Sequence, residues 1–280
     1  MIRTSSTPAV VTKVLTKSAT CARAAGSLAA TALTVKEGLL SALPVIPGTF
    51  AGSGGGGGGG GTGGSGPASA CLNPAAYTSP SNVHLDYGVS GAFTGSSVSD
   101  TVSALNVIFE GQTATEFRST QTTSYTGQPT ILSSSSSYAK LENLDVVTYG
   151  STSDITTPLT GTVKSVFSPP SRDKRYSLGV GESATQTYNI TSTSTFTGLP
   201  TITQTTLQTE TVKYLGHETV TVPAGTFDTC KFEQGNGSST VWIAAGSAAG
   251  VAAKSSSTSQ GTTVILELRS GTINGTAIRP

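Results

Sequence analysis

An unbroken run of eight glycines, residues 54–61, limits which part of the chain can fold. Glycine loses the most conformational freedom on folding and has no side chain to bury, so this run is expected to act as a flexible tether. About 210 residues follow it, enough for one sizeable hydrophobic core. The sequence therefore predicts a leader-like segment over 1–53, a glycine-rich tether over 54–70 and one β domain over 71–280.

The two sides of the tether also differ in charge. Residues 1–70 carry five basic residues and one acidic residue, whereas the rest of the chain carries 11 basic and 14 acidic residues. A nucleic-acid partner would need a basic stripe, and residues 71–280 offer only the short cluster Arg172, Lys174 and Arg175. That cluster follows two prolines and is expected to be a solvated loop, so nucleic acid is not expected as a partner.

Serine and threonine, rather than charged residues, supply most of the polar positions, since charged residues make up only 11% of the chain. Val83, Leu85, Tyr87 and Val89 alternate with polar residues, and residues 264–268 repeat this pattern. Strict alternation is typical of strands with one buried and one solvent-exposed face. No long stretch of the sequence keeps the 3.6-residue period of a helix. The chain is therefore predicted to be all-β, with a curved antiparallel sheet that forms a half-barrel or a sandwich.

The clearest turn signal lies at Pro223, Ala224 and Gly225. Proline suits the second position of a turn, and glycine supplies the positive φ that closes a hairpin loop of about three to five residues. Phe227 and the only tryptophan, Trp242, lie in the strands that follow. Both are expected to be core aromatics or to face a ligand.

The segment ahead of the tether looks like a secretory signal. Residues 39–46 form a short apolar stretch with basic residues upstream, and Phe50-Ala51-Gly52 follows it. With the glycine run, this arrangement resembles the exported lipoproteins of Gram-negative envelopes, in which a small-residue box precedes a lipidated cysteine. Position 53 is serine, which has no thiol to receive a lipid. Cys71, preceded by Ala68-Ser69-Ala70, is the other candidate for a lipidated cysteine, but alanine three residues before it fits the small-residue box poorly.

No stretch of the sequence reaches the ~20 apolar residues that a membrane-spanning helix needs, so no transmembrane span is expected.

The C-terminal third carries a second resemblance. The strand that enters residues 222–227, the later Thr240-Val241-Trp242 strand and the long final strand resemble a class of uncharacterised bacterial envelope proteins. These are similar to the half-barrels of periplasmic lipoprotein carriers. The resemblance is most specific over 210–270 and implies a protein of the periplasm or cell surface, with a concave sheet for an apolar ligand. It implies no catalytic residue.

The chain has three cysteines, Cys21, Cys71 and Cys230. If the leader is removed, an even pair remains, and such a pair in an exported chain predicts a Cys71–Cys230 disulfide. A free buried thiol at Cys230 and a metal site are the alternatives. Neither a metal nor another cofactor is expected, because the chain has only two histidines and no close Cys/His spacing.

The sequence offers no grouping typical of an enzyme. His84 and His217 are the only imidazoles, and both are expected to be exposed on strands rather than paired with a nucleophile. Two carboxylate pairs are interpreted as loop solvation: Glu110 with Glu116, and Glu142 with Asp145. We therefore predict no catalytic residue and no enzymatic activity.

Threonine recurs at every second position in several stretches, among them residues 185–187, 191–195 and 201–203. Such an array could bind ice or glycans, although it is also common on the wet face of a sheet. The leading hypothesis is a non-catalytic envelope protein that holds a lipid or another apolar molecule, or an envelope protein partner. The alternative is a structural or adhesive surface module with a Ser/Thr-rich exposed β face.

Overall fold

The computed structural model describes residues 66–156, 160–235, 237–259 and 261–280, all within one compact unit. The leader over 1–53 and the tether up to residue 65 lie outside the described residues. Within the described ranges, no helix is long and apolar enough to cross a membrane.

The described chain is built from antiparallel strands and a few short 3-10 helices. The strands are β1 (Asn82–Gly91), β2 (Gly95–Phe109), β3 (Gln112–Tyr125), β4 (Ile131–Glu142), β5 (Asp145–Ile155), β6 (Gly161–Asp173), β7 (Ser183–Phe196), β8 (Ile202–Val222), β9 (Gly225–Gln234), β10 (Ser239–Ala244), β11 (Ala252–Ser259), β12 (Thr262–Ile273) and β13 (Thr276–Ala277). The 3-10 helices are η2 (Ala68–Cys71), η3 (Pro74–Tyr77), η4 (Arg175–Ser177) and η5 (Gly246–Ala248). The prediction of an all-β antiparallel fold is thus confirmed.

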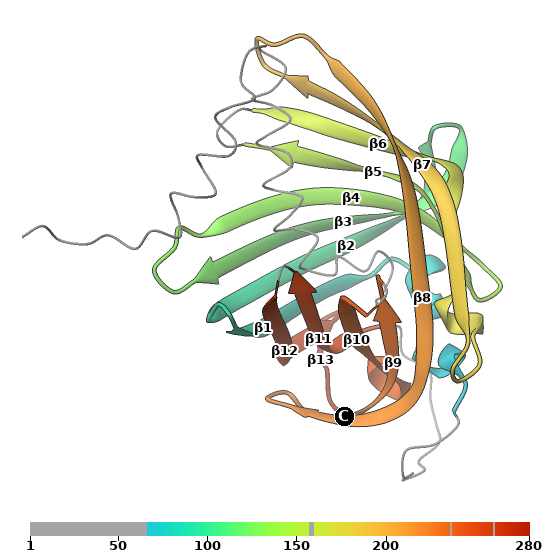
Figure 1. The fold of residues 1–280 in the computed structure, drawn as a ribbon, viewed down its shortest axis with the longest axis vertical. Helices are drawn as coiled ribbons and strands as arrows, with labels where there is room; N and C mark the ends of the chain where they lie inside the picture. The colour runs from blue at the N-terminus through green and yellow to red at the C-terminus, as the bar shows by residue number, and fades with distance from the viewer. Residues whose placement is uncertain (1–65, 157–159, 236, 260) are drawn as a thin grey trace, which may run out of the picture. The chain divides into compact units, whose positions relative to one another are not determined.

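The prediction of a half-barrel or sandwich was wrong, because the sheet closes on itself (Figure 1). Each strand pairs with the next, and β1 then pairs with β12, from Val83 opposite Ile273 to Gly91 opposite Val264. The result is a closed twelve-stranded barrel, with β13 as a short hairpin partner of β12. Closure pairs the backbone N–H and C=O groups that an open sheet would leave unpaired along its first and last strands.

The inner face of the barrel has an apolar zone and a hydroxyl-rich zone. Buried side chains from both ends of the sequence form the apolar zone, including Val83, Phe117, Tyr214, Phe232, Ile243 and Leu268. Along β3, the row that begins with Phe117 continues through Ser119, Gln121 and Thr123. Gln121 Nε2 donates to Ser97 Oγ over 2.9 Å, and the hydroxyls of Ser97 and Thr123 lie 3.0 Å apart. These bonds satisfy polar groups that burial would otherwise leave unpaired.

Strand β8 is the longest strand and extends beyond its neighbour β9 (Figure 1). It pairs with β7 from Ile202 to Lys213, but with β9 only from Val212 to Val222. Among the described strands, residues 202–210 therefore form ladder hydrogen bonds on one side only. This part of the β7–β8 hairpin is an overhang with a free edge.

The basic cluster near Arg175 is only partly the solvated loop expected from the sequence. Arg172 is exposed and pairs with two carboxylates, but Arg175 in η4 is buried. Arg175 Nε donates to Asp173 Oδ2 over 2.6 Å, and the guanidinium lies 5.7 Å from the ring centroid of Phe232. The planar guanidinium can pair with a carboxylate and stack on a ring at once, which is how this charge becomes part of the core.

Burial of tyrosines gives a testable dependence of stability on alkaline pH. Tyr87 donates its hydroxyl to the carbonyl of Ala252 over 3.0 Å, and burial raises the pKa of Tyr87. Above about pH 10 an unfolded chain loses this proton while the folded protein keeps it. The stability that Tyr87 contributes is therefore complete below about pH 10 and falls by up to about 1.4 kcal/mol per pH unit above it.

Urea unfolding from about pH 9 to about pH 11 measures this effect. The Tyr87→Phe variant should lose stability less steeply than the parent over that range. Equal slopes for the two proteins would contradict the assignment to Tyr87.

Candidate functional site

The predicted Cys71–Cys230 disulfide is confirmed, with the two Cα atoms 6.0 Å apart. Cys71 ends η2 and Cys230 lies on β9, so the bond ties the start of the described chain to the barrel wall. Neither cysteine has exposed surface. With its sulfur in the disulfide, Cys71 has no thiol left to carry a lipid.

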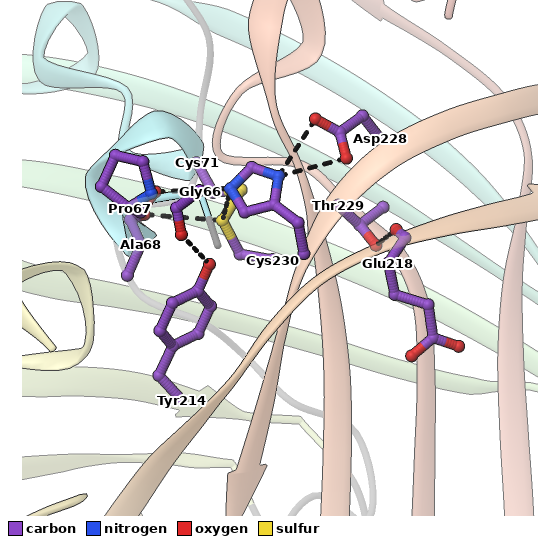
Figure 2. Close-up of polar contacts among 10 residues, drawn as sticks. Gly66, Pro67, Ala68, Cys71, Tyr214, Glu218, Asp228, Thr229 and Cys230 are labelled. Carbon is purple, nitrogen blue, oxygen red and sulfur yellow. Dashed lines mark hydrogen bonds and ion pairs between the residues drawn. A yellow bond between two sulfur atoms is a disulfide. The ribbon is translucent and has the colours of Figure 1, made fainter. Parts of the chain in front are cut away.

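One hydrogen bond holds the segment next to this disulfide against the barrel, and two further pairs of polar atoms lie close together there (Figure 2). Tyr214 donates its hydroxyl to the carbonyl of Gly66 over 2.7 Å. The carbonyl oxygen of Pro67 lies 3.4 Å from His217 Nε2, and that of Ala68 lies 3.6 Å from Cys230 Sγ. A sulfur in a disulfide has no proton to donate, so the last contact is a hydrogen bond only for a free thiol.

The expectation that His217 is an exposed strand residue was wrong, because its side chain is only 12% exposed and lies beside the disulfide. A register shift between Tyr214 and Gly216 places His217 directly opposite Cys230. His217 Nε2 lies 3.5 Å from Cys230 Sγ. A Cβ on Gly66 would lie 2.6 Å from Nε2, so any residue other than glycine at position 66 would displace the ring.

The other nitrogen of His217 faces a carboxylate. Both oxygens of Asp228 lie 3.1 Å from Nδ1. A neutral ring that donates Nδ1–H to Asp228 directs the lone pair of Nε2 towards the sulfurs. The structure thus aligns a carboxylate, an imidazole and a sulfur, although a sulfur held in a disulfide is not a nucleophile.

The argument against a metal site from sequence spacing also has to be corrected. The two sulfurs and one ring nitrogen of Cys71, His217 and Cys230 all lie within 4.8 Å of one another. The fold collects these three ligands from η2, β8 and β9. No local spacing could reveal that grouping.

The expectation that His84 is exposed on a strand is confirmed, in contrast to that for His217. His84 lies on β1, is about half exposed, and its Nδ1 is 2.7 Å from Asp100 Oδ1 on β2.

The aromatic candidates separate into a core residue and a surface residue. Phe227 is buried in the apolar zone. Trp242 is partly buried on β10, with the ammonium groups of Lys231 and Lys254 at 5.1 and 5.9 Å from its ring centroid. This arrangement is a cation–π row across β9, β10 and β11.

The hairpin residues lie between β8 and β9 in a shorter loop than the sequence predicted. Val222 pairs with Gly225, so Pro223 and Ala224 are the only loop residues. Gly225 has a φ of 137°, a conformation that other residues rarely adopt.

Both carboxylate pairs are partnered by basic residues. Arg172 donates to Glu142 over 2.6 Å and to Asp145 over 3.2 Å, and the bond to Arg172 lowers the pKa of Glu142. Lys164 donates to Glu110, and Arg118 donates to Glu116. These ion pairs involve strand and hairpin residues rather than a cleft between two carboxylates.

A second candidate surface is a ladder of threonine pairs on the outer face of β7 and β8. Four pairs of hydroxyls lie within hydrogen-bond distance: Thr185–Thr211 at 2.9 Å, Thr187–Thr209 at 3.1 Å, Thr191–Thr205 at 3.1 Å and Thr193–Thr203 at 3.3 Å. We call this surface, together with the central Asn189–Leu207 pair, the threonine ladder. From its first to its last rung it extends about 27 Å along the hairpin.

The threonine ladder is open to solvent and neutral. Leu207 at its centre is 66% exposed, and the outer threonines of the overhang are exposed as well. None of its ten side chains is ionisable. In each pair one hydroxyl donates to the other, so each pair retains one free O–H donor and several lone pairs for an external partner.

Comparison of the chain with protein-family models, with curated proteins and with solved structures finds no match. The fold and sites define the protein as a closed antiparallel β-barrel with a buried disulfide and an external threonine ladder.

Proposed function

We propose that the protein is an exported, non-catalytic adhesive module that binds neutral glycan strands along the threonine ladder. The single observation that carries this proposal is the solvent-exposed ladder itself, with four paired hydroxyl rungs on one hairpin. A row of neutral donors and acceptors matches the repeated hydroxyls of a polysaccharide. The absence of ionisable groups in the ladder disfavours a strongly charged partner.

The disulfide supports export, because such bonds persist in oxidising compartments and are rare in the cytosol. Placement in the periplasm or at the surface of a Gram-negative cell stays a prediction.

Binding of an apolar ligand inside the barrel also stays a prediction. The inner face supports it less than the ladder supports a glycan. Beyond the apolar zone, the inner row of β4 presents Ser133, Ser135 and Ser137 opposite residues of β3. Many of the buried apolar side chains are themselves packed into the core cluster.

The ladder proposal is tested by removing hydroxyls while keeping side-chain shape. Thr187, Thr191, Thr205 and Thr209 are replaced together by valine, which has the same branched shape and a high strand propensity. Co-sedimentation with insoluble neutral glycans, such as cellulose and chitin, should show binding by the parent and at least about tenfold weaker binding by the variant.

The matched control is the Thr258→Val/Thr263→Val variant, which removes another exposed hydroxyl pair, 2.9 Å apart, from β11 and β12. It should bind as the parent does. Absence of binding by the parent to any of the glycans, or equal binding by the ladder variant, would refute the proposal.

A further inference from the structure

We infer that Cys71, Cys230 and His217 form a zinc site when the disulfide between the two cysteines is reduced. This inference does not depend on the proposed glycan binding. The two sulfurs and the ring nitrogen already lie within 4.8 Å of one another, and each is an atom type that zinc prefers.

The spacing between imidazole and sulfur fits a tetrahedral zinc ion. Zinc binds sulfur at about 2.3 Å and nitrogen at about 2.0 Å, so tetrahedral angles place the two ligand atoms about 3.5 Å apart. His217 Nε2 and Cys230 Sγ are 3.5 Å apart in the structure. The two sulfurs have to separate to about 3.8 Å, and Cys71 Sγ, which lies within 4.8 Å of Nε2, has to come to about 3.5 Å from it. Reduction frees the two cysteine side chains to rotate into these positions.

Asp228 supplies the outer contact that zinc-binding histidines usually have. Its carboxylate holds Nδ1 at 3.1 Å, which fixes the ring and leaves Nε2 facing Cys230 Sγ. Three protein ligands leave one of four positions for water, as in zinc sites that remain open.

The surroundings favour an ion over two free thiolates. Both cysteines are fully buried, and burial penalises an uncompensated thiolate charge. A Zn²⁺ ion neutralises two thiolates at once.

The reaction balances with a dithiol as reductant. The dithiol gives two electrons and two protons to the Cys71–Cys230 bond and becomes a disulfide, while both cysteines become thiols. Zn²⁺ then binds the two sulfurs and His217 Nε2, and the two thiol protons are released to water.

The test uses the full chain with the substitution Cys21→Ser, so that Cys71 and Cys230 are the only cysteines. Co²⁺ is the probe, because tetrahedral coordination by thiolates gives it charge-transfer and ligand-field absorption bands. The disulfide is reduced with a phosphine, which takes an oxygen from water and becomes a phosphine oxide. One equivalent of Co²⁺ should bind after reduction, and none should bind with these bands before it; Zn²⁺ should displace the Co²⁺.

Variants then assign the ligands. His217→Ala should weaken Co²⁺ binding at least tenfold, and Asp228→Asn should weaken it about 10–100-fold through the outer contact. The matched control is His84→Ala, which removes the other histidine that contacts an aspartate and should leave binding unchanged.

Three results would each overturn the inference. They are the same Co²⁺ spectrum before and after reduction, no Co²⁺ binding by the reduced protein, and binding that is unaffected by His217→Ala. Far-UV circular dichroism of each sample shows whether β structure is kept, so a reduced protein that unfolds and binds no Co²⁺ also counts against the site.

Discussion

Loss of the Cys71–Cys230 disulfide is expected to lower the free energy of unfolding by about 5 kcal/mol. The bond joins residues 159 positions apart, so it removes a large amount of conformational entropy from the unfolded chain. It also holds η2 and the adjoining residues against β9. This is the largest effect that we expect from changing a single covalent bond in the described chain.

Urea unfolding of a Cys71→Ala/Cys230→Ala variant measures the effect against a parent, with Cys21→Ser in both proteins. A chelator in every sample prevents bound metal from changing the comparison. Equal midpoints and slopes for the two proteins would mean that the covalent loop contributes nothing to stability.

Phe232→Ala is expected to lower the free energy of unfolding by about 3–5 kcal/mol. Phe232 has no exposed surface, and its ring lies 5.1 Å from that of Tyr214 and 6.0 Å from that of Tyr176. The same ring lies under the guanidinium of Arg175. Truncation therefore leaves a cavity and removes the aromatic surface on which a buried charge rests.

The control for this truncation is Leu207→Ala, since Leu207 is a large apolar side chain that is exposed to solvent in the threonine ladder. Its effect should stay within about 0.5 kcal/mol, as is usual for surface substitutions. Urea unfolding monitored by circular dichroism compares the two variants. If Phe232→Ala lowered the free energy of unfolding as little as Leu207→Ala does, the assignment of Phe232 to the core would be wrong.

The antiparallel fold could be predicted because alternation is a local property of the sequence. Val83, Leu85 and Val89 mark β1 on their own, and the alternation over 264–268 marks β12. Closure could not be predicted in the same way. It depends on β1 and β12 finding each other across most of the chain, and either strand would show the same pattern in an open sheet.

The candidate sites divide along the same line. Counting cysteines was enough to predict the disulfide, and the period of two was enough to indicate a threonine face. The position of His217 depends on a one-residue register shift beside Tyr214 and on contacts from residues 66 and 67. The burial of Arg175 depends on Asp173 and on the ring of Phe232, neither of which its own basic neighbours suggest.

The covalent loop has a mechanical consequence for a force applied between residue 66 and the threonine ladder. Without the disulfide, the chain from Cys71 to Thr205 could be pulled out to about 450 Å. With the disulfide, the force passes through the two sulfurs to Cys230. Only the chain between Thr205 and Cys230, about 25 residues, can then be extended, to about 85 Å. Strands β1 to β7 lie in the chain between Cys71 and Thr205, which then bears no force, so they can refold when the force is released.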